Sequence, residues 1–209
     1  DLGLEVDYIA TCKMHISCDL KIKPGVTIAF ETNAGLSIGD DGSLNALGTT
    51  NDPIIFTGVD KAPGAWAGIF FDSEDVKNKL SECKIEYASG DAFNSNGDEG
   101  GIILYAGSKA VIENTTIQNC DGYGINANYS DGDFTFQNNT ISGCTMPMFI
   151  AAEYGGDING GTYTGNTTDV IYIKSYASAG TILTPQTWTN LSIPYRIQGS
   201  GDITSNTDW

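Results

Sequence analysis

The chain has 209 residues, of which 26 are acidic and 10 are Lys or Arg, so its formal net charge is −16. Such a charge repels nucleic-acid phosphates and anionic membrane surfaces, and we therefore expect neither as a partner. The sequence has no run of about 18 apolar residues, so no direct membrane insertion is expected. Glycine is abundant (26) and proline sparse (6), which favours many short strands joined by turns over helices.

The first segment, residues 1–23, is expected to be a lead-in or cap. It contains Cys12 and Cys18, which are close enough in sequence to form a small disulfide loop in an oxidising compartment. Two free thiols are the alternative. Zinc-type binding is not favoured, because the chain has no Cys-x-x-Cys pair and only one histidine, His15.

Residues 24–192 contain short apolar runs that recur at a nearly constant spacing. One series is Ile69, Ile102, Ile125, Phe149 and Ile171, at steps of 33, 23, 24 and 22 residues. A second series, Ile85, Ile117, Ile141 and Tyr163, interleaves with it at steps of 32, 24 and 22. Because both series contain one long step at the same place, a single loop insertion at residues 89–99 explains both.

This repeat predicts an all-β fold, a parallel β-helix with coils of 22–24 residues, as one domain over 1–209. A leucine-rich repeat would need its own leucine and asparagine pattern, which is absent. Residues two apart in a strand point the same way, so alternate members of each run should face inward. The expected inward pairs are Ile69 with Phe71, Ile102 with Leu104, Ile125 with Ala127, Phe149 with Ala151, and Ile171 with Ile173.

The repeat also brings polar residues and cysteines into register. Asn114 and Asn138 occupy equivalent positions in successive repeats. An inward asparagine there could hydrogen-bond to the backbone of adjacent coils. Cys120 and Cys144 also align, and we interpret them as small inward residues. A disulfide between neighbouring coils is the alternative, although parallel side chains give it poor geometry. The sequence leaves the state of Cys83 open.

Several early segments carry a resemblance to a known superfamily. They are Leu20–Ile28 (LKIKPGVTI), Gly42–Gly48 (GSLNALG), Asp52–Gly58 (DPIIFTG) and Trp66–Phe70 (WAGIF). In this order they resemble the opening of right-handed parallel β-helix proteins of the pectin-lyase-like superfamily, particularly secreted or surface proteins of bacteria. The resemblance extends over about residues 7–200 and implies an extracellular or cell-surface location. The motifs are structural, so they imply the fold rather than an activity.

The C-terminal segment, residues 193–209, resembles the start of a further module. Its stretch Ile193–Ile203 is similar to the lead-in that precedes such coils, and Asp7-Tyr8-Ile9 matches it at the other end of the chain. The chain could therefore be one module of a longer array.

The superfamily includes polysaccharide hydrolases, lyases and esterases as well as adhesins, so catalytic residues must be sought directly. The polygalacturonase-like segments are missing: the one Asp-Asp pair, Asp40-Asp41, lies at an early turn, and no GHG or RIK occurs. A lyase would need a base, for which Lys174 is a candidate, although a solvated lysine is the preferred interpretation. A Ser/His/Asp site would depend on His15, which we interpret as a surface or cap residue. No enzyme signature emerges, and a non-catalytic role is favoured.

The outward residues beside the inward series suggest a binding face. Aromatic rings stack on pyranose faces while amides and carboxylates bond to hydroxyls, so a face that mixes them suits glycans. Sheet surfaces favour Tyr and Phe anyway, and the inserted loop or a partner domain could cover this face. The candidate residues are Phe70, Asp72, Tyr105, Tyr123, Asn126, Asn128, Tyr129, Tyr154, Tyr172 and Lys174.

The inserted loop is also a weak candidate for a metal site. Its Asp91, Asp98 and Glu99 carry oxygen ligands that calcium accepts, but their spacing matches no known calcium loop. No cofactor other than Ca²⁺ is expected. The sequence thus favours a secreted or surface β-helix module that binds a glycan or another surface protein, or has a structural role. A polysaccharide lyase or hydrolase with an atypical site is the alternative.

Overall fold

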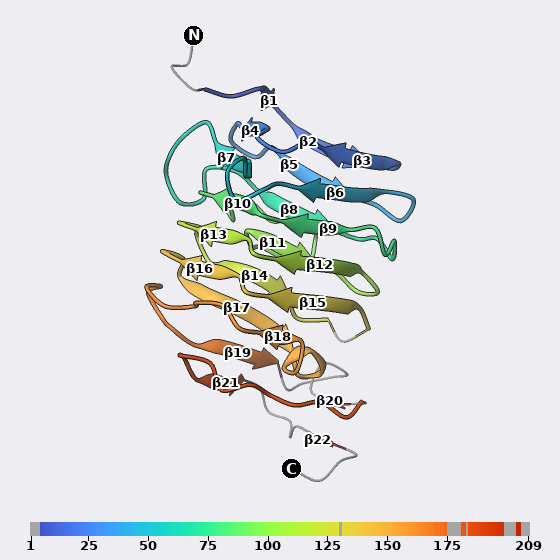
Figure 1. Ribbon diagram of the computed structural model, residues 1–209, viewed down its shortest axis with the longest axis vertical. Helices are drawn as coiled ribbons and strands as arrows, with labels where there is room; N and C mark the ends of the chain where they lie inside the picture. Colours follow the sequence, from blue (N-terminus) through green and yellow to red (C-terminus); the bar gives the residue numbers. More distant parts are fainter. Residues whose placement is uncertain (1–4, 130, 175–180, 183, 199–203, 206–209) are drawn as a thin grey trace.

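The computed structural model describes residues 5–129, 131–174, 181–182, 184–198 and 204–205. Within them the chain winds as a solenoid whose coils pass through three parallel sheets in turn, with sheet B continuing beyond the last strands of sheets A and C (Figure 1). Sheet A contains β1 (Tyr8–Ala10), β4 (Thr27–Phe30), β7 (Ile54–Gly58), β10 (Cys83–Glu86), β13 (Thr116–Gln118) and β16 (Thr140–Ser142). The predicted right-handed parallel β-helix is confirmed.

Sheet B is the longest and carries the predicted face. Its strands are β2 (Lys13–Ile16), β5 (Gly35–Ile38), β8 (Gly68–Phe71), β11 (Ile102–Leu104), β14 (Tyr123–Ala127), β17 (Met146–Ala151), β19 (Ile171–Lys174) and β21 (Tyr195–Gln198). Sheet C contains β3 (Asp19–Ile22), β6 (Ser43–Leu47), β9 (Lys79–Ser81), β12 (Lys109–Glu113), β15 (Asp133–Gln137) and β18 (Ile158–Asn159). The short 3₁₀ turn η1 (Ala152–Tyr154) follows β17, and β20 (Thr181–Ile182) pairs with β22 (Thr204–Ser205).

The strand register corrects one part of the predicted repeat. Ile125 pairs with Met148, which pairs with Ile171, so the three steps from Ile102 to Ile171 are 23 residues each. Met148 and Ile150 are therefore the inward residues of β17, and Phe149, expected inward, lies on the outward face. The error arises because β17 is apolar on both faces, and periodicity cannot then tell which alternate set is inside.

Inward apolar side chains at equivalent positions of successive coils stack on one another and fill the interior of the solenoid. Ile69, Ile102 and Ile125 are fully buried and stack on successive strands of sheet B. Near the N-terminal coils, the rings of Phe30 and Trp66 stack with centroids 4.1 Å apart, and the Trp66 indole N–H donates to the Glu86 carbonyl at 2.8 Å. Both side chains are fully buried and belong to the hydrophobic core.

The turns between sheets C and A depend on asparagine, but not in the way that we expected. Asn114 and Asn138 have φ angles of 47° and 54°, in the left-handed region that asparagine tolerates. The inward polar residues are the next ones, Thr115 and Asn139, which are 1% and 0% exposed. The expectation that Asn114 and Asn138 point inward is therefore wrong by one residue, because turn geometry reverses the side-chain direction there.

The predicted insertion lies between β10 and β11, on the way from sheet A to sheet B. It is not the only long connection, since Leu36 pairs with Ile69, also 33 residues later. The expectation of a further module at residues 193–209 falls partly on residues outside the described ranges. Within them, β21 pairs in parallel with β19 and continues sheet B. Among the described residues no helix is long and apolar enough to cross a membrane.

Candidate functional site

The inserted loop folds over the outward face of sheet B. Its Phe93 ring stacks on Phe70 of β8, with centroids 5.4 Å apart and planes 14° apart. Lys13 of β2 anchors the loop, because its Nζ donates to Asp91 at 2.9 Å and to the Ala92 carbonyl at 2.7 Å. A side chain at Gly35 would place its Cβ only 2.5 Å from Phe93 Cζ, so the glycine leaves room for the ring.

A row of four aromatic rings crosses three coils beneath and beside this loop. The ring of Tyr105 lies 5.7 Å from Phe70, and the ring of Tyr129 lies 4.7 Å from Tyr105. Phe70 is only 7% exposed because Phe93 covers it, whereas Tyr105 and Tyr129 are half-buried with surface left open to solvent. We call Phe93, Phe70, Tyr105 and Tyr129 the aromatic row.

Amide and carboxylate groups of the loop fix the exposed end of the aromatic row. The Tyr129 hydroxyl donates to Asp98 Oδ2 at 2.9 Å, and Asn94 donates to the same oxygen at 2.7 Å. Asn96 Nδ2 reaches the hydroxyls of Tyr105 and Tyr129 at 3.5 and 3.3 Å. The tyrosine rings are thus held in place by hydrogen bonds as well as by packing.

Two predicted asparagines lie under the loop rather than in solvent. Asn126 is 4% exposed and donates to the Glu99 carbonyl at 3.0 Å. Asn128 is 6% exposed and donates to Asn126 Oδ1 at 2.7 Å. The possibility left open by the sequence, that the inserted loop covers part of this face, therefore holds for these asparagines and for Phe70.

Lys174 lies two coils beyond Tyr129, and its side chain reaches back to contact the aromatic row. Its side chain passes the small Ala151 of β17, and its Nζ donates to Asn128 Oδ1 at 2.7 Å. The same nitrogen lies 5.0 Å from the centroid of the Tyr129 ring. Burial lowers the pKa of Lys174, while burial and the hydrogen bond to Asp98 raise the pKa of Tyr129 to about 12.

Other candidates lie away from the aromatic row. The ring of Tyr123 stacks on Phe149 at 5.3 Å, and the Arg196 guanidinium lies 5.7 Å from the centroid of the Tyr172 ring. Asp72 is partly buried near the N-terminal coils, and burial, with a contribution from Asp40, raises its pKa.

Tyr154 is not part of the outward face. It is 1% exposed, packs edge-on against Phe134 at 4.7 Å, and its hydroxyl accepts from the Gly132 N–H at 2.7 Å. The expectation that it faces outward is wrong, because η1 follows β17 directly and turns the chain so that this side chain packs inward.

The structure does not bring the candidate calcium ligands together. Asp91 pairs with Lys13, Asp98 accepts from Tyr129 and Asn94, and Glu99 is exposed. Among the described residues no group of three or more His, Cys, Asp or Glu side chains could hold a metal ion.

Cys12 and Cys18 are exposed free thiols, so the predicted disulfide loop is absent. The cause is β2, which separates them: its four extended residues span roughly 13 Å, whereas bridged cysteines need Cα atoms within about 7 Å. Cys83, Cys120 and Cys144 are free and buried, as small inward residues would be.

Sequence reasoning missed Phe93, Asn96 and Phe149 as parts of this face. Phe93 has a signal that could have found it, since it is the one large apolar residue within the polar insertion. Asn96 has none, because its contacts depend on how the loop folds back over Tyr105 and Tyr129.

The parallel coils, their inward ladders and the covered outward face define a right-handed parallel β-helix protein with a candidate ligand-binding face. The family model for the right-handed beta helix region matches residues 27–183, and the chain belongs to this family. No curated protein and no solved structure matches the chain.

Proposed function

We propose that the chain is a non-catalytic extracellular or cell-surface module that binds glycans through the aromatic row and the amides beside it. The observation that carries the proposal is the pair Tyr105 and Tyr129. Both residues are half-buried with some surface open to solvent, their rings lie 4.7 Å apart on adjacent coils, and Asn96 contacts both hydroxyls. Rings held in this way lose little further conformational entropy on binding, which favours stacking on a sugar ring.

The location outside the cell rests on the resemblance to secreted and surface β-helix proteins. Another surface protein is the alternative partner for the same face. A glycan ligand is favoured because the exposed part of the face combines tyrosine rings with amides, whereas protein interfaces depend more on a continuous apolar centre.

A glycan array probed with the purified chain tests this proposal. We expect binding to one class of glycans, and we expect Tyr129→Ala to raise the Kd for that glycan by about five- to thirtyfold, since a stacked ring contributes about 1–2 kcal/mol. The matched control is Tyr87→Asn, at another half-exposed tyrosine whose φ of 63° asparagine tolerates. Equal affinity of the Tyr129 and Tyr87 variants for the bound glycan, or no glycan bound at all, would contradict the proposal.

A lyase or hydrolase acting on an extracellular polysaccharide is the second candidate, and one observation favours it. Lys174 and Tyr129 are neighbouring ionisable groups, both partly buried, with pKa values moved by that burial. An amine with a lowered pKa is a better general base at neutral pH, and shifted pairs of this kind cluster at catalytic sites. In this role Lys174 would remove the proton beside a uronate carboxylate, and Tyr129 would donate to the leaving oxygen.

One assay distinguishes glycan binding from catalysis. Incubation with uronate polymers, followed by the ultraviolet absorbance of unsaturated product, should show turnover only if the chain is a lyase. Reducing-sugar release covers hydrolysis. Turnover that is lost in Lys174→Met and in Tyr129→Phe would replace the binding proposal with the catalytic one, whereas glycan binding without product would exclude catalysis on those substrates.

A further inference from the structure

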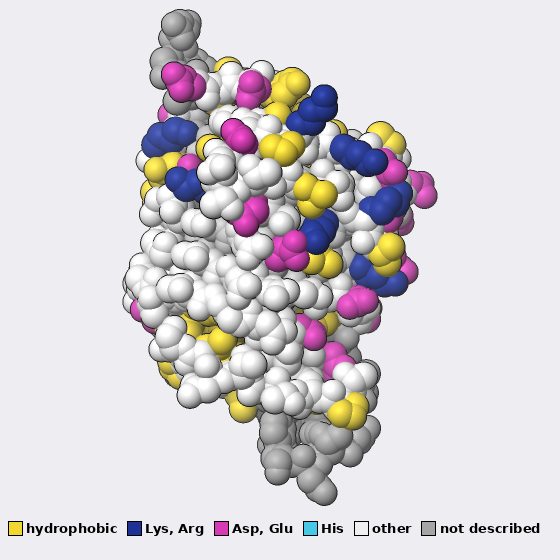
Figure 2. Space-filling model, in the orientation of Figure 1, with side chains coloured by type: hydrophobic (Ala, Val, Ile, Leu, Met, Phe, Trp, Pro, Cys, Tyr) yellow, Lys and Arg dark blue, Asp and Glu magenta, His cyan; other side chains and the backbone are white. Residues whose placement is uncertain are grey.

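One lysine on the outward face of sheet B donates to an amide carbonyl. Figure 2 shows Lys and Arg side chains beside acidic ones on the upper coils. The ion pairs that the structure describes include those of Lys13, Lys77, Lys79 and Lys84. Lys174, at the end of β19, donates from Nζ to Asn128 Oδ1 at 2.7 Å. Because Cγ of the amide is bonded to that oxygen, an amine lies next to the carbonyl carbon with which it can form a new amide.

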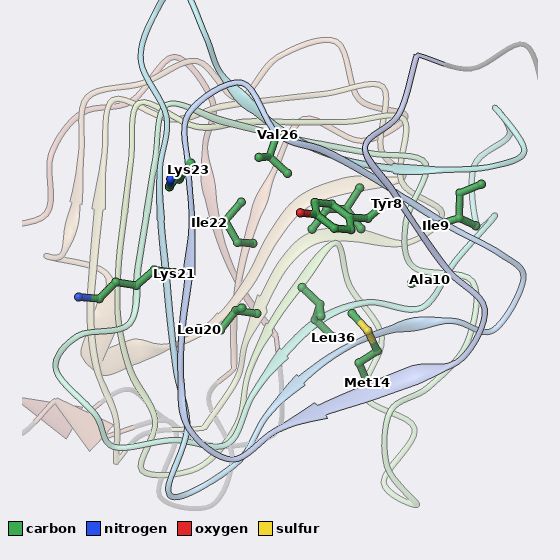
Figure 3. Close-up of a pocket in the computed structure, with 11 residues that line it drawn as sticks. Tyr8, Ile9, Ala10, Met14, Leu20, Lys21, Ile22, Lys23, Val26 and Leu36 are labelled. Carbon is green, nitrogen blue, oxygen red and sulfur yellow. The ribbon is translucent and has the colours of Figure 1, made fainter.

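The hollow at the N-terminal end brings no such pair together. It has a volume of about 570 Å³ and is lined mainly by apolar side chains, with Met14, Leu20 and Leu36 pointing into it (Figure 3). Lys21 points away from it, and its lining includes no amide or carboxylate side chain. The chemistry available within this chain therefore lies on sheet B.

A chain of hydrogen bonds directs the Asn128 carbonyl toward the lysine. Asn126 Nδ2 donates to the Glu99 carbonyl at 3.0 Å, which leaves Asn126 Oδ1 as the acceptor for Asn128 Nδ2 at 2.7 Å. Asn128 Oδ1 is then the atom that faces Lys174. Because a backbone carbonyl only accepts, the direction of each bond in this chain is fixed. Both asparagines are buried, so their amides have little freedom to turn away.

The strand register gives the lysine a path to its partner. Ala127 of β14 pairs with Ile150 of β17, so the next residues, Asn128 and Ala151, lie at the same level. Ala151 in turn pairs with Lys174. The lysine crosses β17 where that strand carries only a methyl group, and it reaches the coil beyond.

The surroundings favour the neutral, reactive form of the amine. Burial lowers the pKa of Lys174, and the charge of Asp98 acts in the opposite direction. The centroid of the Tyr129 ring lies 5.0 Å from Nζ, so the ring shields one side of the amine from water. A desolvated lysine is a better nucleophile, because more of it is unprotonated at neutral pH. Asp98 is itself 6% exposed, and its Oδ2 accepts from the Tyr129 hydroxyl at 2.9 Å.

We propose that Lys174 and Asn128 form a covalent amide bond within the folded chain, with Asp98 as the proton acceptor. The Lys174 ammonium loses a proton to Asp98, directly or across one water molecule, and Nζ attacks Cγ of Asn128. A second Nζ proton passes to Nδ2, the bond between Cγ and Nδ2 breaks, and ammonia leaves. Ammonia then takes the proton from Asp98 and departs as ammonium. One C–N bond forms and one breaks, so the step needs no oxidant or cofactor.

The bond joins two strands that have a whole coil between them. It links residues 46 apart in the sequence, from the end of β14 to the end of β19 across β17. A covalent link of this kind stabilises a fold mainly by restricting the unfolded chain. The inference does not depend on glycan binding, since the aromatic row remains available. It is incompatible with Lys174 as the base of a lyase, because an amide nitrogen accepts no proton at neutral pH.

Mass spectrometry of the purified wild-type chain is the decisive measurement and needs no variant. We expect an intact mass below the sequence mass by one ammonia molecule. After proteolysis we expect a branched peptide that joins the segments around Asn128 and Lys174. A succinimide at an Asn-Gly step such as Asn96-Gly97 loses the same mass but leaves these segments separate. The full sequence mass, or recovery of the two segments only as separate peptides, would overturn the proposal.

Three variants test the roles of the residues. Lys174→Met keeps a long side chain without the amine and should show the full sequence mass, whereas Lys109→Met, at a half-buried lysine of β12, is the matched control and should show the wild-type loss. Asp98→Asn keeps an oxygen that can accept from Tyr129 but lacks the charge, and it should lose ammonia about a hundredfold more slowly. Loss of ammonia in Lys174→Met, or a wild-type rate in Asp98→Asn, would contradict the proposed chemistry. The linked chain should also have a higher urea midpoint than Lys174→Met.

Discussion

Single buried polar side chains bond one coil to the next. Asn139 is fully buried, its Oδ1 accepts from the Thr115 N–H at 3.0 Å, and its Nδ2 donates to the Ile112 carbonyl at 2.8 Å. Asn78 and Asn166 make equivalent bonds, with Leu44 N–H and Cys144 N–H as donors. At these turns some backbone N–H and C=O groups have no partner in the neighbouring strands. Each asparagine side chain hydrogen-bonds to such groups, which would otherwise be buried without partners.

Asn139→Ala should destabilise the fold by about 2–4 kcal/mol, because it leaves a buried N–H and a buried carbonyl without partners. The free energy of unfolding from urea titrations measures the effect. The neighbouring Asn138 is exposed and has a φ of 54°, so Asn138→Gly is the control and should change stability by less than about 1 kcal/mol. Similar losses in the two variants would show that the turn conformation, not the buried bonds, holds the coils together.

Asp157 gives the molecule a pH dependence. Burial, followed by the charges of Asp133 and Glu153, raises its pKa from 3.8 to about 6. A raised pKa means that the folded state binds the proton of Asp157 more tightly than the unfolded chain does. The stability that the protonated carboxyl contributes is therefore fully present below pH 3.8 and is lost as the pH rises through about 6. Asp157→Asn should therefore stabilise the fold by about 1–2 kcal/mol at pH 7 and by almost nothing at pH 4. Unfolding titrations at the two pH values test this, and an equal gain at both would contradict it.

At the scale of secondary structure, the sequence predicts the strands better than it predicts the faces. The faces of β14 were predictable because the inward Ile125 and Ala127 alternate with the polar Asn126, whereas β8 and β11 are apolar on both faces and were placed by the spacing of the repeat. The faces of β17 were not predictable, since Met148 and Phe149 are both apolar and only pairing with Ile125 and Ile171 fixes which one is inside. The position of the insertion could be found from the spacing, but its fold over sheet B depends on Lys13, 78 residues before Asp91.

Phe93 should hold the inserted loop against sheet B. Phe93→Ala removes the stack on Phe70 and the contact with Lys13, whose Nζ lies 4.9 Å from the centroid of its ring. We expect a loss of about 1–3 kcal/mol in stability and faster hydrogen exchange at residues 91–99, with the other coils unaffected. Ser95→Ala, at the exposed tip of the loop, is the control and should change neither quantity. Unchanged exchange in Phe93→Ala would show that the polar contacts alone position the loop.

At the scale of the whole molecule, fold and binding face differ in how strongly the sequence constrains them. A solenoid interior repeats the same physical requirement at every coil, so nine apolar positions in two series were enough to predict the architecture. The outward face has no such repetition: Phe70, Ile103, Asn126 and Phe149 occupy equivalent outward positions in four consecutive coils. The inserted loop determines which of these residues are covered, since it contacts Phe70 and Asn126. Contacts between a loop and a distant strand cannot be predicted from the repeat in the sequence.

Because each coil contacts only its neighbours, position along the solenoid should decide how far a defect spreads. Ile125 of β14 is fully buried between two coils, whereas Ile16 of β2 is half-buried in the first coil with a partner strand on one side only. Ile125→Ala should cost about 2–4 kcal/mol and lower the urea midpoint of the whole domain, since it interrupts the stack in the middle. Ile16→Ala should cost roughly 1 kcal/mol and speed hydrogen exchange mainly in β1, β2 and β3, because the end coil can open without disturbing the rest.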